Sequence, residues 1–225
     1  MQYPKLVIFD CDGIITETAE LHYEAWKQVS KDYFDLILDE KFLNRFRGLS
    51  RDKSLDLILK VGEINYLEDD KREEIILKKN AIYKNLITDK NKVKAFETTI
   101  EMIHQLKEKG ILIALASISK NARQLLEVNE IVDLFDYIAD PHNIKNSKPA
   151  PDIFLDARDH FNLTSQECWG VEDAKVGVQA INSAGMLSIG VGDLQEISQA
   201  DIQFDNISKL SLENIERIMK EKNIT

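Results

Sequence analysis

Two acidic pairs, each at the end of an apolar run, are the residues of this sequence best suited to chemistry. Asp10 and Asp12 directly follow the apolar run 6–9, and Gly13 permits the chain to turn there. Taken alone, this pair fits a solvated turn or a helix cap as well as a functional site. The choice between these interpretations depends on what else reaches the same place.

The second pair changes that balance. Glu172 and Asp173 follow the apolar run 168–171, although Asp173 could also simply cap the next helix. If both strand ends face one crevice, four carboxylates converge. At an effective dielectric constant of ~20, two such charges ~4 Å apart repel each other by about 4 kcal/mol. A divalent cation removes that cost, and oxygen-only ligands favour Mg²⁺.

Two further run ends supply hydroxyl groups and positive charge. Ser117, Ser119, Lys120 and Asn121 follow the run 111–116, where hydroxyls and the start of a helix suit an anionic oxygen. Ser119 can equally be an ordinary helix cap. Lys148 precedes two prolines, and its position between a strand and a helix start favours a function. The usual alternative is a solvated surface lysine.

Composition excludes several classes of protein. The chain has 225 residues, 44% of them hydrophobic, and a net charge of −10, so it is neither generally disordered nor suited to binding nucleic acid or an anionic membrane surface. No apolar run approaches the ~18 residues that span a bilayer, and the N-terminus does not resemble a secretory signal. Cys11 and Cys168 are too few for a disulfide framework. We expect a cytoplasmic, soluble protein whose two cysteines are buried without redox duty.

Short apolar runs alternate with amphipathic stretches over most of the chain. This alternation predicts an α/β doubly wound fold around a parallel sheet. The expected strands are 6–9, 111–116, 168–171 and 186–191, and the expected helices are 96–109, 119–128, 151–161, 173–184 and 211–222.

The first two expected strands are separated by a long stretch with only helical patterns. These cover 18–31, 39–46, 51–61 and 67–87. We therefore expect an all-helical domain at 17–91, inserted into a discontinuous α/β core made of 1–16 and 92–225. Because ligands bind at the carboxyl ends of parallel strands, the insertion is expected to cover the site as a lid.

The four chemical segments together resemble a known family. D-x-D-G at 10–13, Ala-Ser at 116–117, Lys-Pro-x-Pro at 148–151 and G-x-E-D at 170–173, in this order, resemble the haloacid dehalogenase superfamily, and the helical insertion resembles its subgroup with a small helical cap. Finer features resemble the β-phosphoglucomutases within it. They are the segments 16–22, 48–54, 116–121, 139–141 and 147–154 together with Trp26.

The resemblance implies a covalent mechanism. Asp10 would attack phosphorus, and Asp12 would act as general acid and base. Ser117 and Lys148 would stabilise the transferred phosphoryl group. Mg²⁺ would be held by the Asp10 carboxylate, the backbone carbonyl of Asp12, Glu172 and Asp173.

The resemblance also implies a substrate. The enzyme would interconvert β-D-glucose 1-phosphate and D-glucose 6-phosphate, with β-D-glucose 1,6-bisphosphate as intermediate and activator. The implied substrate-binding residues are Thr18, His22, Trp26, Gly48, Arg51, Ser54, Lys79, Ser119, Lys120 and Asn121. Sugar phosphates would be its partners, with no nucleic acid or membrane, and we expect a monomer.

Alternatives remain open for the cap residues and for the function. Arg51 would clamp the second phosphate but could also simply begin a helix. His22 could be a packing residue, and Lys79 could extend along an apolar face into solvent. A sugar-phosphate phosphatase on the same scaffold is the nearest alternative function. A catalytically silent binding protein is a more distant one, disfavoured by the intact Asp10 and Lys148.

Overall fold

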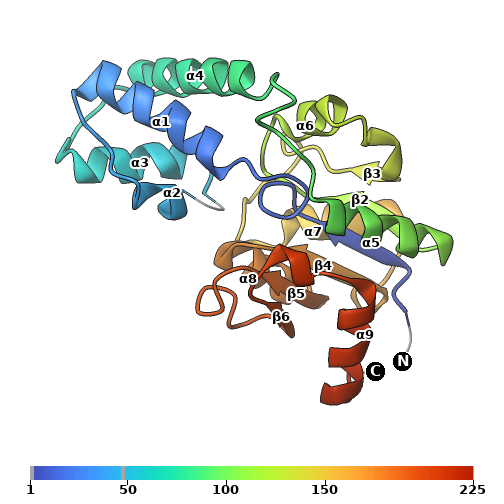
Figure 1. Cartoon of the computed structure of the whole chain (residues 1–225). Helices are drawn as coiled ribbons and strands as arrows, with labels where there is room; N and C mark the ends of the chain where they lie inside the picture. The colour runs from blue at the N-terminus through green and yellow to red at the C-terminus, as the bar shows by residue number, and fades with distance from the viewer. Residues whose placement is uncertain (1–2, 47–48, 225) are drawn as a thin grey trace. The chain divides into compact units, whose positions relative to one another are not determined.

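The computed structural model describes residues 3–46 and 49–224. The chain divides into two compact units, one formed by residues up to Glu17 and from Lys94 onward, the other by Thr18–Val93 (Figure 1). The domain limits expected from the sequence, at 16/17 and 91/92, differ from this division by one and two residues.

The first unit is built on a six-stranded sheet in which every pairing is parallel. The strands lie in the order β3-β2-β1-β4-β5-β6. This confirms the predicted doubly wound α/β fold. The strands are β1 (Leu6–Phe9), β2 (Leu112–Leu115), β3 (Tyr137–Ile138), β4 (Cys168–Glu172), β5 (Leu187–Val191) and β6 (Ile202–Phe204).

Helices cover both faces of this sheet, so its two central strands, β1 and β4, are buried throughout. On one face, α7 and α8 pack against Leu6 and Ile8 of β1. In Figure 1, α5 and α9 lie in front of the sheet and α7 lies behind it. The helices are α5 (Glu97–Glu108), α6 (Ala122–Val128), α7 (Asp152–His160), α8 (Lys175–Ser183) and α9 (Leu212–Lys222), with 3₁₀ turns η1 (Val132–Leu134), η2 (Ser165–Glu167) and η3 (Ile207–Lys209).

The strand order places the two acidic pairs side by side. From β1 the chain builds outward to β2 and β3, then returns to the other side of β1 with β4. The register pairs Phe9 with Val171, so β1 and β4 end at the same level. Ligands bind at such a switch point in open α/β sheets, because the loops there separate in opposite directions.

The second unit is helical over its described residues, as expected. Its helices enclose their own apolar core, to which Trp26, Leu55, Ile58 and Ile75 belong. The helices are α1 (Ala19–Phe34), α2 (Phe42–Arg45), α3 (Arg51–Val61) and α4 (Asp69–Leu86). We call this unit the cap. Its expected action as a lid remains a prediction.

The sequence pattern missed two strands, β3 and β6. They contain two and three residues and lie at the two edges of the sheet. Segments of that length complete no alternation of apolar and polar residues, so periodicity cannot detect them. Their pairing is decided by the neighbouring strands rather than by their own sequence.

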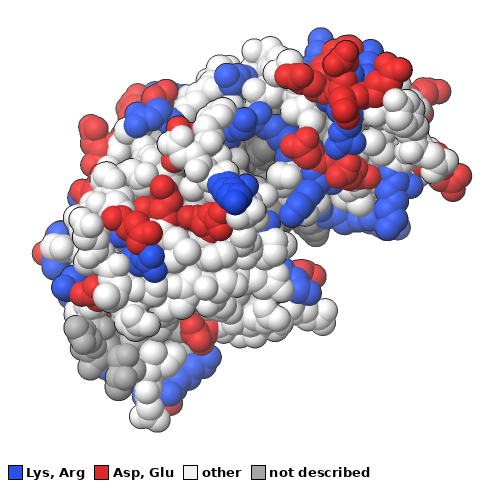
Figure 2. All heavy atoms as spheres, turned by 180° about the vertical axis from the view of Figure 1, so that it is seen from behind, with Lys and Arg blue, Asp and Glu red and all other residues white. Residues whose placement is uncertain are grey.

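The surface is charged with both signs. Figure 2 shows acidic and basic side chains interspersed over the visible face. Among the described residues, no helix has the length and apolar character needed to cross a membrane. The exclusion of nucleic acid as a partner stays a prediction.

We predict that neither cysteine reacts in the native protein. Both side chains are buried, and burial raises the pKa of Cys168 to about 11 and that of Cys11 well above its ordinary value. Because the thiolate is the reactive form, an aromatic disulfide reagent at pH 8 should modify no thiol until urea is added, and then both. Glu213→Cys, at an exposed position of α9, is the positive control and should react at once. Rapid modification of the native wild-type protein would contradict the burial of these thiols.

Candidate active site

Asp10 lies at the carboxyl end of β1, where the central strand ends. Its backbone N–H donates to Val171 O at 3.0 Å, which extends the pairing with β4 as far as this residue. The chain then turns sharply, with Gly13 at φ +88° and its N–H donating to Thr16 O at 2.7 Å. A positive φ at this point favours glycine. The D-x-D-G motif is therefore a strand end followed by a turn, and its glycine adopts the backbone conformation that this turn requires.

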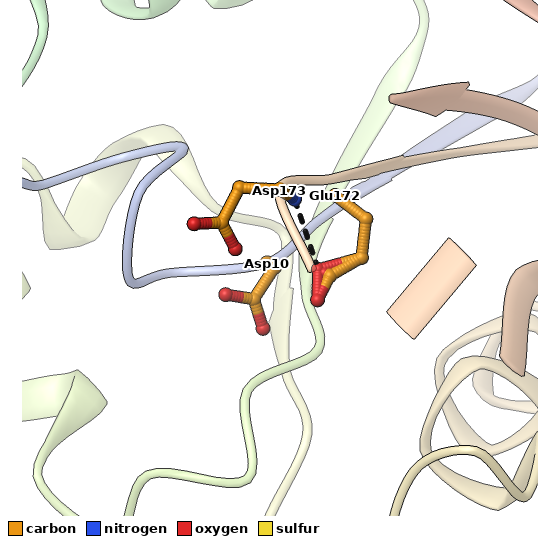
Figure 3. A group of neighbouring side chains, drawn as sticks. All are labelled: Asp10, Glu172 and Asp173. Carbon is orange, nitrogen blue, oxygen red and sulfur yellow. Dashed lines mark hydrogen bonds between the residues drawn. The ribbon is translucent and has the colours of Figure 1, made fainter. Parts of the chain in front are cut away.

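Glu172 and Asp173 come to the same place from β4. Ligand oxygens of Asp10, Glu172 and Asp173 all lie within 4.8 Å of one another (Figure 3). The backbone N–H of Asp173 donates to Glu172 Oε2 at 3.2 Å, drawn as the dashed line in Figure 3. Of the four carboxylates expected to converge at these strand ends, three form this group, those of Asp10, Glu172 and Asp173.

Lys148 reaches this group from the loop between β3 and α7. Its Nζ lies 2.6 Å from Asp10 Oδ1 and 3.4 Å from Glu172 Oε1. The side chain is only 1% exposed, so Lys148 is a buried partner of two carboxylates and not a solvated surface lysine. Nζ also lies 5.0 Å from the centre of the Phe154 ring, a cation–π contact from α7.

The pKa shifts show how strongly these charges interact. Burial raises the pKa of Asp10 and raises that of Glu172 well above its ordinary value, although Lys148 opposes both shifts. Burial alone would lower the pKa of Lys148, but the negative charges of Asp10 and Glu172 outweigh it and raise that pKa. Lys148 is therefore an ammonium ion at neutral pH, and the group holds three carboxyl groups against one cation.

This donor set fits Mg²⁺. The three carboxyl groups offer only oxygen atoms, and with Lys148 they leave an excess of two negative charges when all are ionised. The Asp12 side chain is not part of the group, and its expected contribution through a backbone carbonyl stays a prediction. So do the individual roles in metal binding of Asp10, Glu172 and Asp173.

The hydroxyl-bearing loop lies at the end of β2, the strand beside β1. The Ala116 N–H donates to Phe9 O, and the next residue, Ser117, is buried. The Ser117 Oγ accepts a hydrogen bond from the Ser119 N–H at 3.1 Å. Asn121 is buried at the start of α6, with its N–H 3.4 Å from Ser119 Oγ, whereas Lys120 is exposed. The loop therefore lies at the carboxyl ends of the strands, the same end as Asp10. Its contact with substrate stays a prediction.

In the cap, His22 and Lys79 form a close pair. Lys79 Nζ lies 2.7 Å from His22 Nδ1, and the Lys79 side chain is only 1% exposed. Lys79 also lies over the rings of Tyr83 and Trp26, at 4.6 and 5.4 Å from their centres. Lys79 therefore does not extend into solvent, and α1 and α4 are joined by a partly buried polar contact.

Tyr83 is a residue that the sequence interpretation missed. Its ring stacks on His22 with centres 4.0 Å apart, and it lies one helical turn after Lys79 on α4. The i, i+4 spacing from a lysine to an aromatic residue was the available signal, but that spacing is common on helices that bury an apolar face. Phe154, whose ring contacts Lys148, was also missed, because an aromatic residue on an amphipathic helix usually indicates only a core.

The remaining cap residues lie near the starts of helices. Arg51 begins α3 and is half-buried, which lowers the pKa of its guanidinium group. Thr18 and Ser54 are buried, and Thr18 O accepts the N–H of His22. Gly48 lies outside the described residues. The substrate-binding roles of all these residues stay predictions.

Comparison with known proteins agrees with this architecture. Residues 7–191 match the haloacid dehalogenase-like hydrolase family. The chain is 39% identical over 211 residues to the β-phosphoglucomutase of Bacillus subtilis, covering 93% of this chain and 92% of that protein. It is 28% identical over 221 residues to a phosphorylated carbohydrates phosphatase of Thermotoga maritima, covering 96% and 99%. The crystal structure of a β-phosphoglucomutase from Clostridium difficile matches with a TM-score of 0.90 and 36% identity, covering 99% of this chain and 100% of that one.

We predict that Lys148→Met destabilises the metal-free protein by about 3–5 kcal/mol at pH 7, because it leaves two buried carboxyl groups without their cation. Lys148 lowers the pKa values of Asp10 and Glu172, so its removal raises them further, and the variant loses more stability than the wild type as pH rises above about 4. Urea unfolding with a chelator should therefore show a smaller loss at pH 5 than at pH 8.

The matched control is Lys145→Met, at an exposed position of the same loop, which should leave stability nearly unchanged. A loss for Lys148→Met that is equally large at pH 5 and pH 8 would contradict the electrostatic explanation and indicate lost packing instead.

Proposed function

The chain belongs to the haloacid dehalogenase-like hydrolase family, and from this premise we propose that it is a Mg²⁺-dependent β-phosphoglucomutase. It interconverts β-D-glucose 1-phosphate and D-glucose 6-phosphate through β-D-glucose 1,6-bisphosphate. The observation that carries the proposal is that the similarity to β-phosphoglucomutases extends over the cap as well as the core. Similarity limited to the core would support only phosphoryl transfer in general.

In the first half-reaction, an oxygen of the Asp10 carboxylate attacks the 1-phosphorus of β-D-glucose 1,6-bisphosphate, the bond from phosphorus to the sugar oxygen breaks, and glucose 6-phosphate leaves. Asp12 gives a proton to the departing sugar oxygen. In the second half-reaction the now ionised Asp12 takes a proton from the 6-hydroxyl of an incoming β-D-glucose 1-phosphate, whose oxygen attacks the aspartyl phosphate. This forms β-D-glucose 1,6-bisphosphate and frees the Asp10 carboxylate. Positioned acids and bases of this kind typically contribute about 10²–10⁴-fold.

Lys148 supports the proposal because its charge is fixed and buried beside the nucleophile. Its Nζ holds Asp10 Oδ1 in place and stays protonated, so it can also neutralise charge on the phosphoryl oxygens. Ser117, at the adjacent strand end, is the proposed hydroxyl donor to those oxygens. Bound Mg²⁺ would supply further neutralisation of the phosphoryl charge, held by Asp10, Glu172 and Asp173.

A mutase must also hold the phosphate that is not reacting. We assign this role to Arg51, whose planar guanidinium group suits a phosphate bidentately and whose half-buried position favours a charged ligand. His22 and Lys79 are the proposed contacts to the sugar, because they already form a partly buried polar pair. A phosphatase would not need this second clamp.

A sugar-phosphate phosphatase remains the second candidate because of one specific observation. A phosphatase for phosphorylated carbohydrates aligns along nearly the whole chain, although at lower identity than the mutase. In that case water would take the place of the sugar hydroxyl as acceptor, and the Asp10 chemistry would be unchanged.

A phosphorus NMR time course separates the two candidates. The protein is given β-D-glucose 1-phosphate, Mg²⁺ and a trace of β-D-glucose 1,6-bisphosphate. The proposal expects glucose 6-phosphate without accumulation of inorganic phosphate. Inorganic phosphate as the main product would instead indicate the phosphatase.

We predict that Arg51→Ala lowers kcat/KM for the mutase reaction by about 10²-fold, since charge-assisted hydrogen bonds contribute about 1.5–3 kcal/mol. Hydrolysis of p-nitrophenyl phosphate, which has no second phosphate, should change far less. Lys60→Ala, at an exposed position of the same helix, is the matched control and should leave both rates unchanged. Equal losses in both assays for Arg51→Ala would count against the clamp.

A further inference from the structure

Gly177 lies directly against the Glu172 side chain. It is the third residue of α8, the helix that follows the G-x-E-D segment. A Cβ atom placed on Gly177 would lie 1.9 Å from Glu172 Oε1, 2.0 Å from Cδ and 2.3 Å from Cγ. No non-bonded carbon can occupy these positions, so any side chain at 177 requires Glu172 to move.

The backbone gives no reason for a glycine at this position. Gly177 is in regular helix and is not among the glycines with positive φ, such as Gly13 and Gly185. Glycine within a helix is less favourable than alanine, because it loses more conformational freedom on folding. Its presence therefore has to be explained by the space that it leaves open.

Glu172 cannot readily vacate that space. Both carboxylate oxygens are used, Oε1 by Lys148 Nζ at 3.4 Å and Oε2 by Asp173 N at 3.2 Å. The side chain is only 2% exposed, so a displaced carboxylate would lose these donors without gaining water. The overlap also involves Cγ and Cδ, which means that rotating the terminal carboxylate alone would not relieve it.

Other buried glycines of the core have different neighbours. A Cβ on Gly170 would meet the Ile181 side chain at 2.6 Å, and one on Gly190 would meet Ala200 and Ile197 at 2.9 Å. Those glycines permit close packing between a strand and apolar side chains. At Gly177 the neighbour is instead a carboxylate of the candidate metal group.

We propose that Gly177 is a positioning residue for this site: its missing side chain creates the space that holds the Glu172 carboxylate against Lys148 and beside Asp10. The contact chain runs from Gly177 to Glu172, from Glu172 to Lys148 and from Lys148 to Asp10. The consequence for Mg²⁺ affinity rests on the proposed function, whereas the packing relation between Gly177 and Glu172 does not.

A double-mutant cycle without metal tests the packing relation. Gly177→Ala alone should lower the midpoint of thermal unfolding by about 4–10 °C, because it overpacks a buried site. In the Glu172→Ala background the space is empty, so the same substitution should have no cost or should raise the midpoint through the better helix propensity of alanine. A purely structural need for glycine in α8 would not produce this change of sign.

The outcomes are distinct even if a variant fails to fold. If Gly177→Ala is unfolded and the double variant Glu172→Ala/Gly177→Ala is folded, the rescue supports the proposal. If Gly177→Ala costs the same in both backgrounds, or if the double variant is as unfolded as Gly177→Ala, the glycine serves helix packing and the proposal is wrong.

Calorimetric titration with Mg²⁺ alone tests the consequence for the site. Gly177→Ala should weaken Mg²⁺ binding by about 10–100-fold, the usual effect of disturbing residues that orient metal ligands. Gly62→Ala, whose Cβ would meet the Ile64 side chain within the cap at 3.1 Å, is the control and should bind Mg²⁺ as the wild type does. Unchanged affinity in a folded Gly177→Ala would overturn the positioning role. Absence of Mg²⁺ binding by the wild type would instead count against the proposed function and leave the metal-free cycle to decide on Gly177.

Discussion

The contact of Lys148 with Asp10 and Glu172 is the interaction on which the rest of the active site depends. Buried carboxyl groups repel one another and lose hydration, and both effects raise the pKa values of Asp10 and Glu172. The Lys148 ammonium group lies 2.6 Å from Asp10 Oδ1 and 3.4 Å from Glu172 Oε1, and it offsets part of their negative charge. The remaining negative charge suits a divalent cation. The Asp10 carboxylate, the proposed nucleophile, can therefore be kept in a largely buried position.

The fold makes this contact possible because it brings segments that are distant in the sequence to the carboxyl ends of the central strands. β1 carries Asp10 and β4 carries Glu172 because the chain reverses its winding direction between them. Lys148 comes from outside the sheet and is steadied by the Phe154 ring. The cap holds a second buried lysine in another way, with Lys79 against an imidazole nitrogen and two aromatic faces. Each unit thus has its own buried lysine, contacted by residues of the same unit.

The sequence predicted the architecture and the chemical residues more fully than their contacts. Apolar runs revealed the four longer strands, whereas β3 and β6 are too short to be periodic. The acidic pairs were evident because carboxylates at the ends of apolar runs are unusual. Gly177 was not identified, because its role depends on the approach of α8 to a particular side chain and glycine alone carries no signal of what fills its space. Tyr83 and Phe154 were hidden for a related reason, since aromatic residues on helices usually indicate only a core.

The central claim is that Asp10 carries the phosphoryl group between two sugar oxygens, and the most direct test is to locate that group on the protein. The enzyme is mixed with β-D-glucose 1,6-bisphosphate and Mg²⁺, quenched in acid within milliseconds, and digested for peptide mass spectrometry. The account predicts one added phosphoryl group on the peptide that contains Asp10, and none in Asp10→Asn. Phosphate on another residue, or turnover of substrate with no phosphorylated peptide in rapidly quenched samples, would contradict it.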